Sequence, residues 1–204
     1  MKNINRRTAI KTVLAGGAAL AVSGVSAQSK QSKKNVPAPL KGNIRHSVSK
    51  WCFGNYDLDE FCKICKRIGI ESVELLDPKD WPIVQQNGLT VAMAQGAGLG
   101  IDRAFNDPSL HDELVKSYEE VIPQVAAAGL TNLICFAGKR NGVTDLQGWE
   151  NCEKGLKRIL PIAEKHNVVL TMELLNSVGH KDYLCDHTVW GVELCRRLGS
   201  PNFK

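Results

Sequence analysis

The first 43 residues of the chain contain no aspartate or glutamate. Residues 1–27 hold four lysines and arginines, so the formal net charge of +5 for the whole chain falls to +1 for residues 28–204. Four further lysines lie in residues 28–43, which leaves residues 44–204 with a formal charge near −3. The net positive charge of the chain therefore comes from its first 43 residues, and the rest of the chain has no surplus of positive charge for binding nucleic acid. We expect no nucleic-acid partner.

The acid-free start of the chain has the form of an export signal. Arg6 and Arg7 precede an uncharged stretch over residues 12–29, and Val25-Ser26-Ala27 offers a small-residue cleavage site. This order predicts a twin-arginine signal peptide over residues 1–27, and hence a periplasmic or otherwise exported protein. The alternative is a membrane anchor, but the stretch is short and rich in glycine, alanine and serine, which favours cleavage and no stable membrane insertion. Residues 28–43, rich in serine, lysine and proline, predict a disordered linker.

The seven cysteines lack the even number and regular spacing of a disulfide framework. Cys62 and Cys65 form a C-x-x-C pair, which is a spacing found in redox sites. However, both lie in the middle of a predicted helix rather than at a strand-to-helix turn. Core packing of two small apolar side chains is therefore the preferred interpretation, and redox chemistry is the alternative.

The sequence also lacks the paired turn residues of β-hairpins. Apolar segments instead alternate with helical patterns, which predicts an α/β architecture with parallel strands. A G-x-G-x-x-G fingerprint is missing as well, and the glycine-rich residues 95–100 do not replace it, so we interpret them as a flexible loop over a site. We expect strands over 44–48, 72–76, 89–94, 132–136 and 168–172, helices over 57–68, 81–86, 107–128, 148–165 and 186–198, and the start of a sixth strand at residue 200.

Glu173 stands out at the end of the fifth expected strand. The preceding run, Val168 to Met172, is apolar at nearly every position, as in a strand buried on both faces. A carboxylate at the end of such a strand has left water and needs a partner or a function. Glu173 is therefore either a metal ligand and acid–base group, or a structural carboxylate paired with a nearby cation.

Several motifs carry a resemblance to a known family. Met172-Glu173-Leu174-Leu175-Asn176-Ser177 resembles the corresponding segment of hydroxypyruvate isomerases, and so do Ser72-Val73-Glu74-Leu75-Leu76 and His180-Lys181-Asp182-Tyr183-Leu184. These enzymes are members of the wider xylose-isomerase-like superfamily, and the resemblance covers residues 44–204. It implies a (β/α)8 TIM barrel, of which this chain holds about the first five βα units as one partial domain.

The resemblance also implies a reaction and a cofactor. The expected reaction converts hydroxypyruvate to tartronate semialdehyde by proton transfer through an enediolate, so the expected partner is a small hydroxy-carbonyl substrate. A divalent metal, Mg²⁺ or Mn²⁺, is expected to polarise the substrate oxygens. Glu173 matches the family's acid on strand five and is thereby expected to bind the metal and to act in catalysis.

Three further residues are candidate substrate contacts. Glu74 ends the second expected strand, and its alternative role is a hydrogen bond to a loop amide or a lysine. His180 lies in the loop after Glu173, where an exposed histidine is the alternative. Asn176 either contacts substrate or orients that loop through its backbone amides.

The metal ligands that the family places on later strands have no counterpart in the sequence. We therefore expect an incomplete barrel that is inactive alone and whose unpaired strand edges favour a homo-oligomer. The alternative functions are a ketose 3-epimerase of the same superfamily and a non-catalytic remnant or binding module. An abasic-site endonuclease is disfavoured, because none of the five histidines lies in a spaced ligand cluster.

Overall fold

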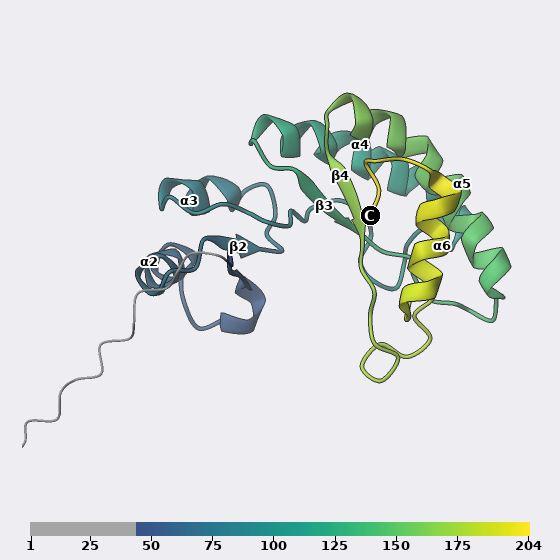
Figure 1. The fold of residues 1–204 in the computed structure, drawn as a ribbon, viewed down its shortest axis with the longest axis horizontal. Helices are drawn as coiled ribbons and strands as arrows, with labels where there is room; N and C mark the ends of the chain where they lie inside the picture. The colour runs from purple at the N-terminus through teal and green to yellow at the C-terminus, as the bar shows by residue number, and fades with distance from the viewer. Residues whose placement is uncertain (1–43) are drawn as a thin grey trace, which may run out of the picture. The chain divides into compact units, whose positions relative to one another are not determined.

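A computed structural model describes residues 44–204 of the chain (Figure 1). The signal peptide predicted over residues 1–27 and the linker predicted over residues 28–43 lie outside these described residues. Within residues 44–204, no helix is long and apolar enough to cross a membrane.

Parallel strand pairs form the centre of the described part. Strand β1 (Ser47–Ser49) pairs with β2 (Ser72–Glu74), and Ser49 lies opposite Glu74. Strand β3 (Asn132–Cys135) pairs with β4 (Val169–Met172), and Cys135 lies opposite Met172. Because both pairs are parallel, the carboxyl end of each strand meets that of its partner, as the sequence pattern predicts.

The strand predicted over residues 89–94 is wrong as a regular strand. This segment lies between β2 and β3 and is joined to them by isolated parallel bridges, from Thr90 to Ser72 and from Ala94 to Leu76 and Leu133, and by single backbone hydrogen bonds. Side chains replace part of the backbone ladder, because the Ala92 N–H donates to the Ser72 hydroxyl at 2.7 Å and its carbonyl accepts from Asn132 Nδ2 at 2.9 Å. The segment thus takes the place of a strand between β2 and β3 without continuous strand pairing.

The last residues of the chain pair with β4. Phe203 bridges to Leu170 of β4, and the Leu170 N–H donates to the Asn202 carbonyl at 2.8 Å. These segments lie side by side in the order β1, β2, segment 89–94, β3, β4 and segment 202–204, and together they form the wall of a partial barrel. This order, with parallel strands and connecting helices, is that of a partial TIM barrel, so the predicted fold class is confirmed.

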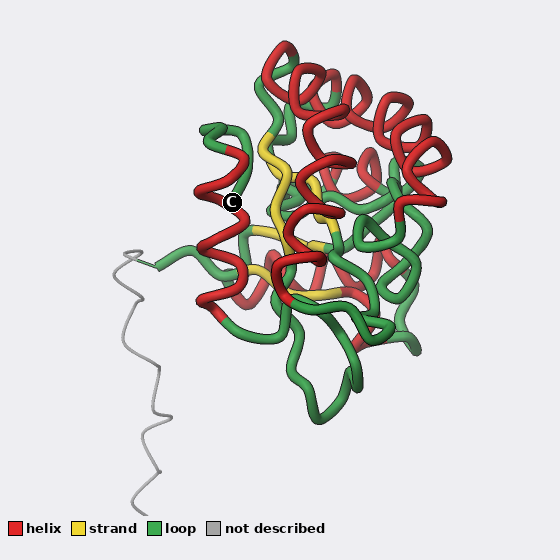
Figure 2. The backbone as a smooth tube through the Cα atoms, turned by 90° about the vertical axis from the view of Figure 1, so that its right-hand side faces the viewer, coloured by secondary structure: helices red, strands yellow, loops and turns green. Residues whose placement is uncertain are grey.

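Helices connect the successive strand positions and lie around the short strands (Figure 2). Local signals set their ends: the Asp57 carboxylate accepts N–H bonds at the start of the first α-helix, and left-handed Gly69 ends it. The α-helices are α2 (Leu58–Ile68), α3 (Trp81–Gln86), α4 (His111–Ala127), α5 (Asp145–Lys165) and α6 (Thr188–Leu198), and the 3-10 helices are η1 (Lys50–Phe53) and η2 (Pro108–Leu110).

The cysteines pack as the sequence pattern predicts. All seven are free thiols, and Cys62 and Cys65 are buried in the core. Burial raises the pKa of the Cys62 thiol to about 11, with a smaller contribution from Cys65. A buried thiol with a raised pKa forms little thiolate at neutral pH, which favours core packing as the role of this pair.

Gly155 of α5 lies close to His111, the first residue of α4, and to Phe105. A Cβ atom there would lie 2.8 Å from His111 Nε2 and 2.8 Å from Phe105 Cδ1, and both of these residues are buried. The His111 ring is held in place because its Nε2 lies 2.9 Å from the Phe105 carbonyl oxygen.

We therefore expect Gly155→Ala to lower the free energy of unfolding by about 1–3 kcal/mol, the usual cost of overpacking a core. Urea denaturation followed by circular dichroism measures the change. Gly54→Ala is the matched control, because a Cβ atom at Gly54 would meet nothing within 4 Å. Equal stability of the two variants would contradict the tight contact.

Candidate active site

The carboxyl ends of β2 and β4 bring two carboxylates to one cavity. Glu74 is the last residue of β2, and Glu173 follows Met172, the last residue of β4. Both line a cavity of about 190 Å³ together with Met93, Ile134 and Thr171. The structure therefore brings together two of the four predicted site residues.

Glu74 is fixed by hydroxyl groups rather than by a loop amide or a lysine. Its carboxylate accepts a hydrogen bond of 2.7 Å from the Ser47 hydroxyl and one of 3.4 Å from the Ser49 hydroxyl. Both serines lie on β1, the strand that pairs with β2. The carboxylate therefore has a defined position at the inner surface of the wall.

Glu173 has the opposite surroundings. Its backbone N–H donates to the Cys135 carbonyl at 3.0 Å, which anchors the main chain. Its carboxylate makes no hydrogen bond or ion pair with another residue of the described part. Burial raises the pKa of the Glu173 carboxyl, His180 opposes the rise, and Glu74 adds to it. The carboxyl is thus partly desolvated, and its proton affinity exceeds that of a solvated glutamate.

Tyr183 supports Glu173 from the following loop. Its buried hydroxyl donates to the Glu173 carbonyl at 3.0 Å and accepts from the Ala137 N–H at 3.0 Å. One side chain thereby joins the chain after β4 to the chain after β3. Tyr183 is part of the motif that begins at His180, but no pattern in the sequence marks it for this role.

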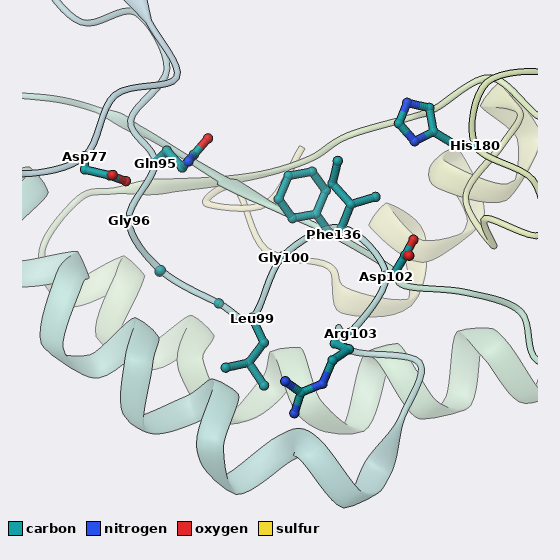
Figure 3. Close-up of a pocket in the computed structure, with 12 residues that line it drawn as sticks. Asp77, Gln95, Gly96, Leu99, Gly100, Asp102, Arg103, Phe136 and His180 are labelled. Carbon is teal, nitrogen blue, oxygen red and sulfur yellow. The ribbon is translucent and has the colours of Figure 1, made fainter. Parts of the chain in front are cut away.

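His180 and Asn176 lie in the loop after β4 but not in the cavity of Glu74 and Glu173. The Asn176 side-chain oxygen accepts from the Gly179 N–H at 2.6 Å, so this exposed residue closes a turn within the loop. His180 lines a second cavity of about 720 Å³ (Figure 3). The same cavity is lined by Asp77, Gln95 and Phe136, which the sequence analysis did not select.

The described residues near Glu173 supply too few ligands for a divalent metal. Mg²⁺ and Mn²⁺ require several oxygen ligands in an octahedral arrangement. In residues 44–204, no group of three or more histidine, cysteine, aspartate or glutamate side chains is arranged to hold a metal ion. The described residues therefore do not complete a metal site around Glu173, and we assign no chemical step to a metal.

A family model described as "Xylose isomerase-like TIM barrel" matches residues 53–204. The chain belongs to this family. No match was found among curated proteins. Membership in the family agrees with the parallel strands of the described part, and it leaves the particular reaction open.

Solved structures agree with the fold. The chain is similar to an AP endonuclease, family 2, from Brucella melitensis, with a TM-score of 0.68 and 16% identity over 78% of this chain and 66% of that one. It is also similar to the D-psicose 3-epimerase of Clostridium cellulolyticum H10, solved with D-tagatose, with a TM-score of 0.63 and 14% identity over 79% and 62% of the two chains. A third similar structure is the IOLI protein with a bound zinc atom, with a TM-score of 0.63 and 12% identity over 78% and 61%.

The chain thus spans less than two thirds of the length of these three structures, and at such low identity the likeness concerns the fold alone. The zinc of the IOLI structure shows that a protein of this fold binds a divalent metal. These comparisons do not decide which substrate the present chain takes.

The Tyr183 bridge gives a first test of the site. We expect Tyr183→Phe to lower the free energy of unfolding by about 1–3 kcal/mol, because it leaves the Ala137 N–H without an acceptor in a buried place. Urea denaturation measures this loss. Tyr56→Phe, at a side chain that is 43% exposed, is the control, and an equal effect of both changes would argue against the bridge.

The desolvation of Glu173 gives a second test. A carboxyl whose folded pKa lies above its unfolded value destabilises the fold once the pH exceeds both values, and has no such effect below both. We expect Glu173→Gln to raise the Tm at neutral pH and to leave it unchanged at pH values well below 4.5, the ordinary pKa of the group. Scanning calorimetry at the two pH values measures the difference. A lower Tm for the variant at neutral pH would contradict the desolvation.

Proposed function

We propose that the protein removes a proton from the carbon next to the carbonyl group of a hydroxy-carbonyl compound and returns a proton to carbon, as an isomerase or epimerase of its family. The observation that supports this proposal is the Glu173 carboxyl, which lies at the carboxyl end of β4, lines a cavity, and has a raised pKa and no partner in the described part. A carboxyl with these properties is suited to take a proton from carbon and return it, because its pKa moves toward the operating pH.

The roles of the other residues follow from their contacts. Glu74, held by the β1 serines, is a fixed acceptor for a substrate hydroxyl on the other side of the same cavity. Tyr183 positions the Glu173 backbone. His180 lies close enough to Glu173 to influence its pKa and contacts the substrate from the second cavity. Asn176 shapes the loop that bears His180.

Two reactions fit these roles. The resemblance of the motifs around Glu173 favours conversion of hydroxypyruvate to tartronate semialdehyde. The second candidate is 3-epimerisation of a ketose, which is favoured by the size of the cavity at His180 and by the fold shared with a D-psicose 3-epimerase and an L-ribulose 3-epimerase. Both reactions begin with removal of a proton from a carbon next to the carbonyl group. The isomerisation returns a proton to the neighbouring carbon, and the epimerisation returns one to the opposite face of the same carbon. A non-catalytic binding module is the alternative that the test below separates from both.

Other features of the proposal rest on the sequence. Export through the twin-arginine pathway rests on residues 1–27, and a homo-oligomer rests on the strand edges of the partial wall. A divalent cation, Mg²⁺ or Mn²⁺, is implied by the resemblance, and it needs ligands in addition to those that residues 44–204 supply.

The test is catalysed exchange of carbon-bound hydrogen. Hydroxypyruvate and D-fructose are incubated with the protein in D₂O, and proton NMR follows loss of the signal next to the carbonyl group. We expect Glu173→Gln to slow this exchange by about 10²- to 10⁴-fold, the usual contribution of a general acid–base group. The matched control is Glu150→Gln, at an exposed glutamate on α5. Exchange no faster than without protein would support the binding module instead.

A further inference from the structure

Two asparagines of the described part precede a glycine, and their surroundings differ. Asn87 directly follows α3 and precedes Gly88, and Asn141 precedes Gly142 in the loop after β3. In an Asn-Gly dipeptide the backbone nitrogen of the glycine readily attacks the asparagine side chain, because glycine has no Cβ atom to obstruct the approach. Asparagine is accordingly among the thermolabile residues of proteins. Whether either pair reacts depends on how tightly the fold holds the side-chain amide and the glycine N–H.

The fold holds the first pair tightly. Asn87 Nδ2 donates to Asp59 Oδ1 and to the Ile83 carbonyl, each at 2.9 Å. The Gly88 N–H donates to the Gln85 carbonyl at 2.9 Å. Attack of the Gly88 nitrogen on the Asn87 side chain would require all three hydrogen bonds to break. The fold therefore protects Asn87 from this reaction.

The second pair is much less restrained. Asn141 and Gly142 are both exposed, and neither the Asn141 side chain nor the Gly142 N–H makes a hydrogen bond within residues 44–204. They are the central residues of a turn, both with positive φ, and one hydrogen bond of 3.1 Å closes it, from the Val143 N–H to the Arg140 carbonyl. Asn141 also lines a small cavity of about 110 Å³, so its side chain has room to turn. Both reacting groups are therefore free to rearrange.

The backbone of Asn141 helps to connect two loops at the carboxyl end of the strands. Its N–H donates to Asp182 Oδ2 at 3.0 Å, and the Arg140 N–H donates to the Asp182 carbonyl at 2.6 Å. The Leu184 N–H donates to the Gly138 carbonyl at 3.0 Å. These three hydrogen bonds tie the loop after β3 to the loop after β4. A change at Asn141 therefore reaches the second loop through the Asp182 carboxylate.

We propose that Asn141 is a site of spontaneous deamidation, and that the modification loosens the loop that bears His180. The Gly142 backbone nitrogen gives its proton to the solvent and forms a bond to Asn141 Cγ. The bond from Cγ to the side-chain nitrogen breaks, and this nitrogen takes up a proton and leaves as ammonia. Water then opens the succinimide ring at either carbonyl and yields aspartate or isoaspartate.

Either product places a second carboxylate close to that of Asp182. The two like charges repel each other, which weakens the hydrogen bond between the loops. The isoaspartate product also lengthens the main chain of the turn, so the N–H at position 141 no longer fits its acceptor.

The first test measures the rate of the modification at both sites. The full chain is incubated in neutral and in mildly alkaline buffer, and peptide mapping by mass spectrometry follows aspartate and isoaspartate at positions 87 and 141. We expect Asn141 to react at least about tenfold faster than Asn87, the effect of hydrogen bonds that must break before the reaction. In concentrated urea both sites should react at similar rates, because the fold no longer protects Asn87. Both rates should rise with pH, because the attacking nitrogen must lose its proton.

The second test measures the consequence for the loops. Asn141→Asp supplies the aspartate product directly, and Gln86→Glu, which adds an equal charge at an exposed position of α3, is the control. Amide hydrogen exchange is followed by NMR. We expect the Arg140 and Leu184 amides to exchange about two- to fivefold faster in Asn141→Asp than in the wild-type protein, as for a like-charge contact at the surface, and at an unchanged rate in Gln86→Glu.

Equal rates at the two asparagines of the folded chain would overturn the assignment of Asn141, as would a lack of product at Asn141 while the urea-treated chain reacts. Unchanged exchange of the Arg140 and Leu184 amides in Asn141→Asp would overturn the loosening of the loop.

Discussion

Parallel pairing of the strands is the constraint on which the site depends. When neighbouring strands run in the same direction, their carboxyl ends meet at one end of the wall, and so do the residues that follow them. This is how Glu74 and Glu173, which are far apart in the sequence, come to line one cavity. The same constraint collects Asp77, Gln95 and His180 around the larger cavity.

The surroundings then give the two glutamates different chemistry. Hydroxyl groups of β1 hydrogen-bond to Glu74 and replace the water that it loses. Glu173 has no such donors in the described part, so burial raises its pKa. Glu74 and Glu173 are the same residue type and both lie at the carboxyl end of a parallel strand. Their different surroundings therefore come from the neighbouring strands. An isomerase needs this asymmetry, because one group has to exchange a proton while the other holds the substrate.

Much of the fold could be predicted from the sequence because its signals are local. Asp57 and Gly69 bound α2 through hydrogen bonds within a few residues, and the order of strands and helices follows from apolar periodicity. The irregular segment 89–94 could not be predicted, because Ala92 is bonded by side chains that lie 20 and 40 residues away. Glu173 could be selected because a carboxylate after a buried strand is unusual, whereas Asp77 resembles any other loop aspartate until its surroundings are known.

The side-chain bonds at Ala92 have a consequence for the spacing of the two carboxylates. Glu74 ends β2 on one side of segment 89–94, and Glu173 follows β4 on the other side. The Ser72 hydroxyl and the Asn132 amide bind Ala92 of this segment from its two sides, and they therefore help to set the distance between the two carboxylates. Backbone bonds cross the same two boundaries, from the Val73 N–H to the Thr90 carbonyl and from the Ile134 N–H to the Ala94 carbonyl, so loss of either side chain would weaken the connection between the two strand pairs without breaking it.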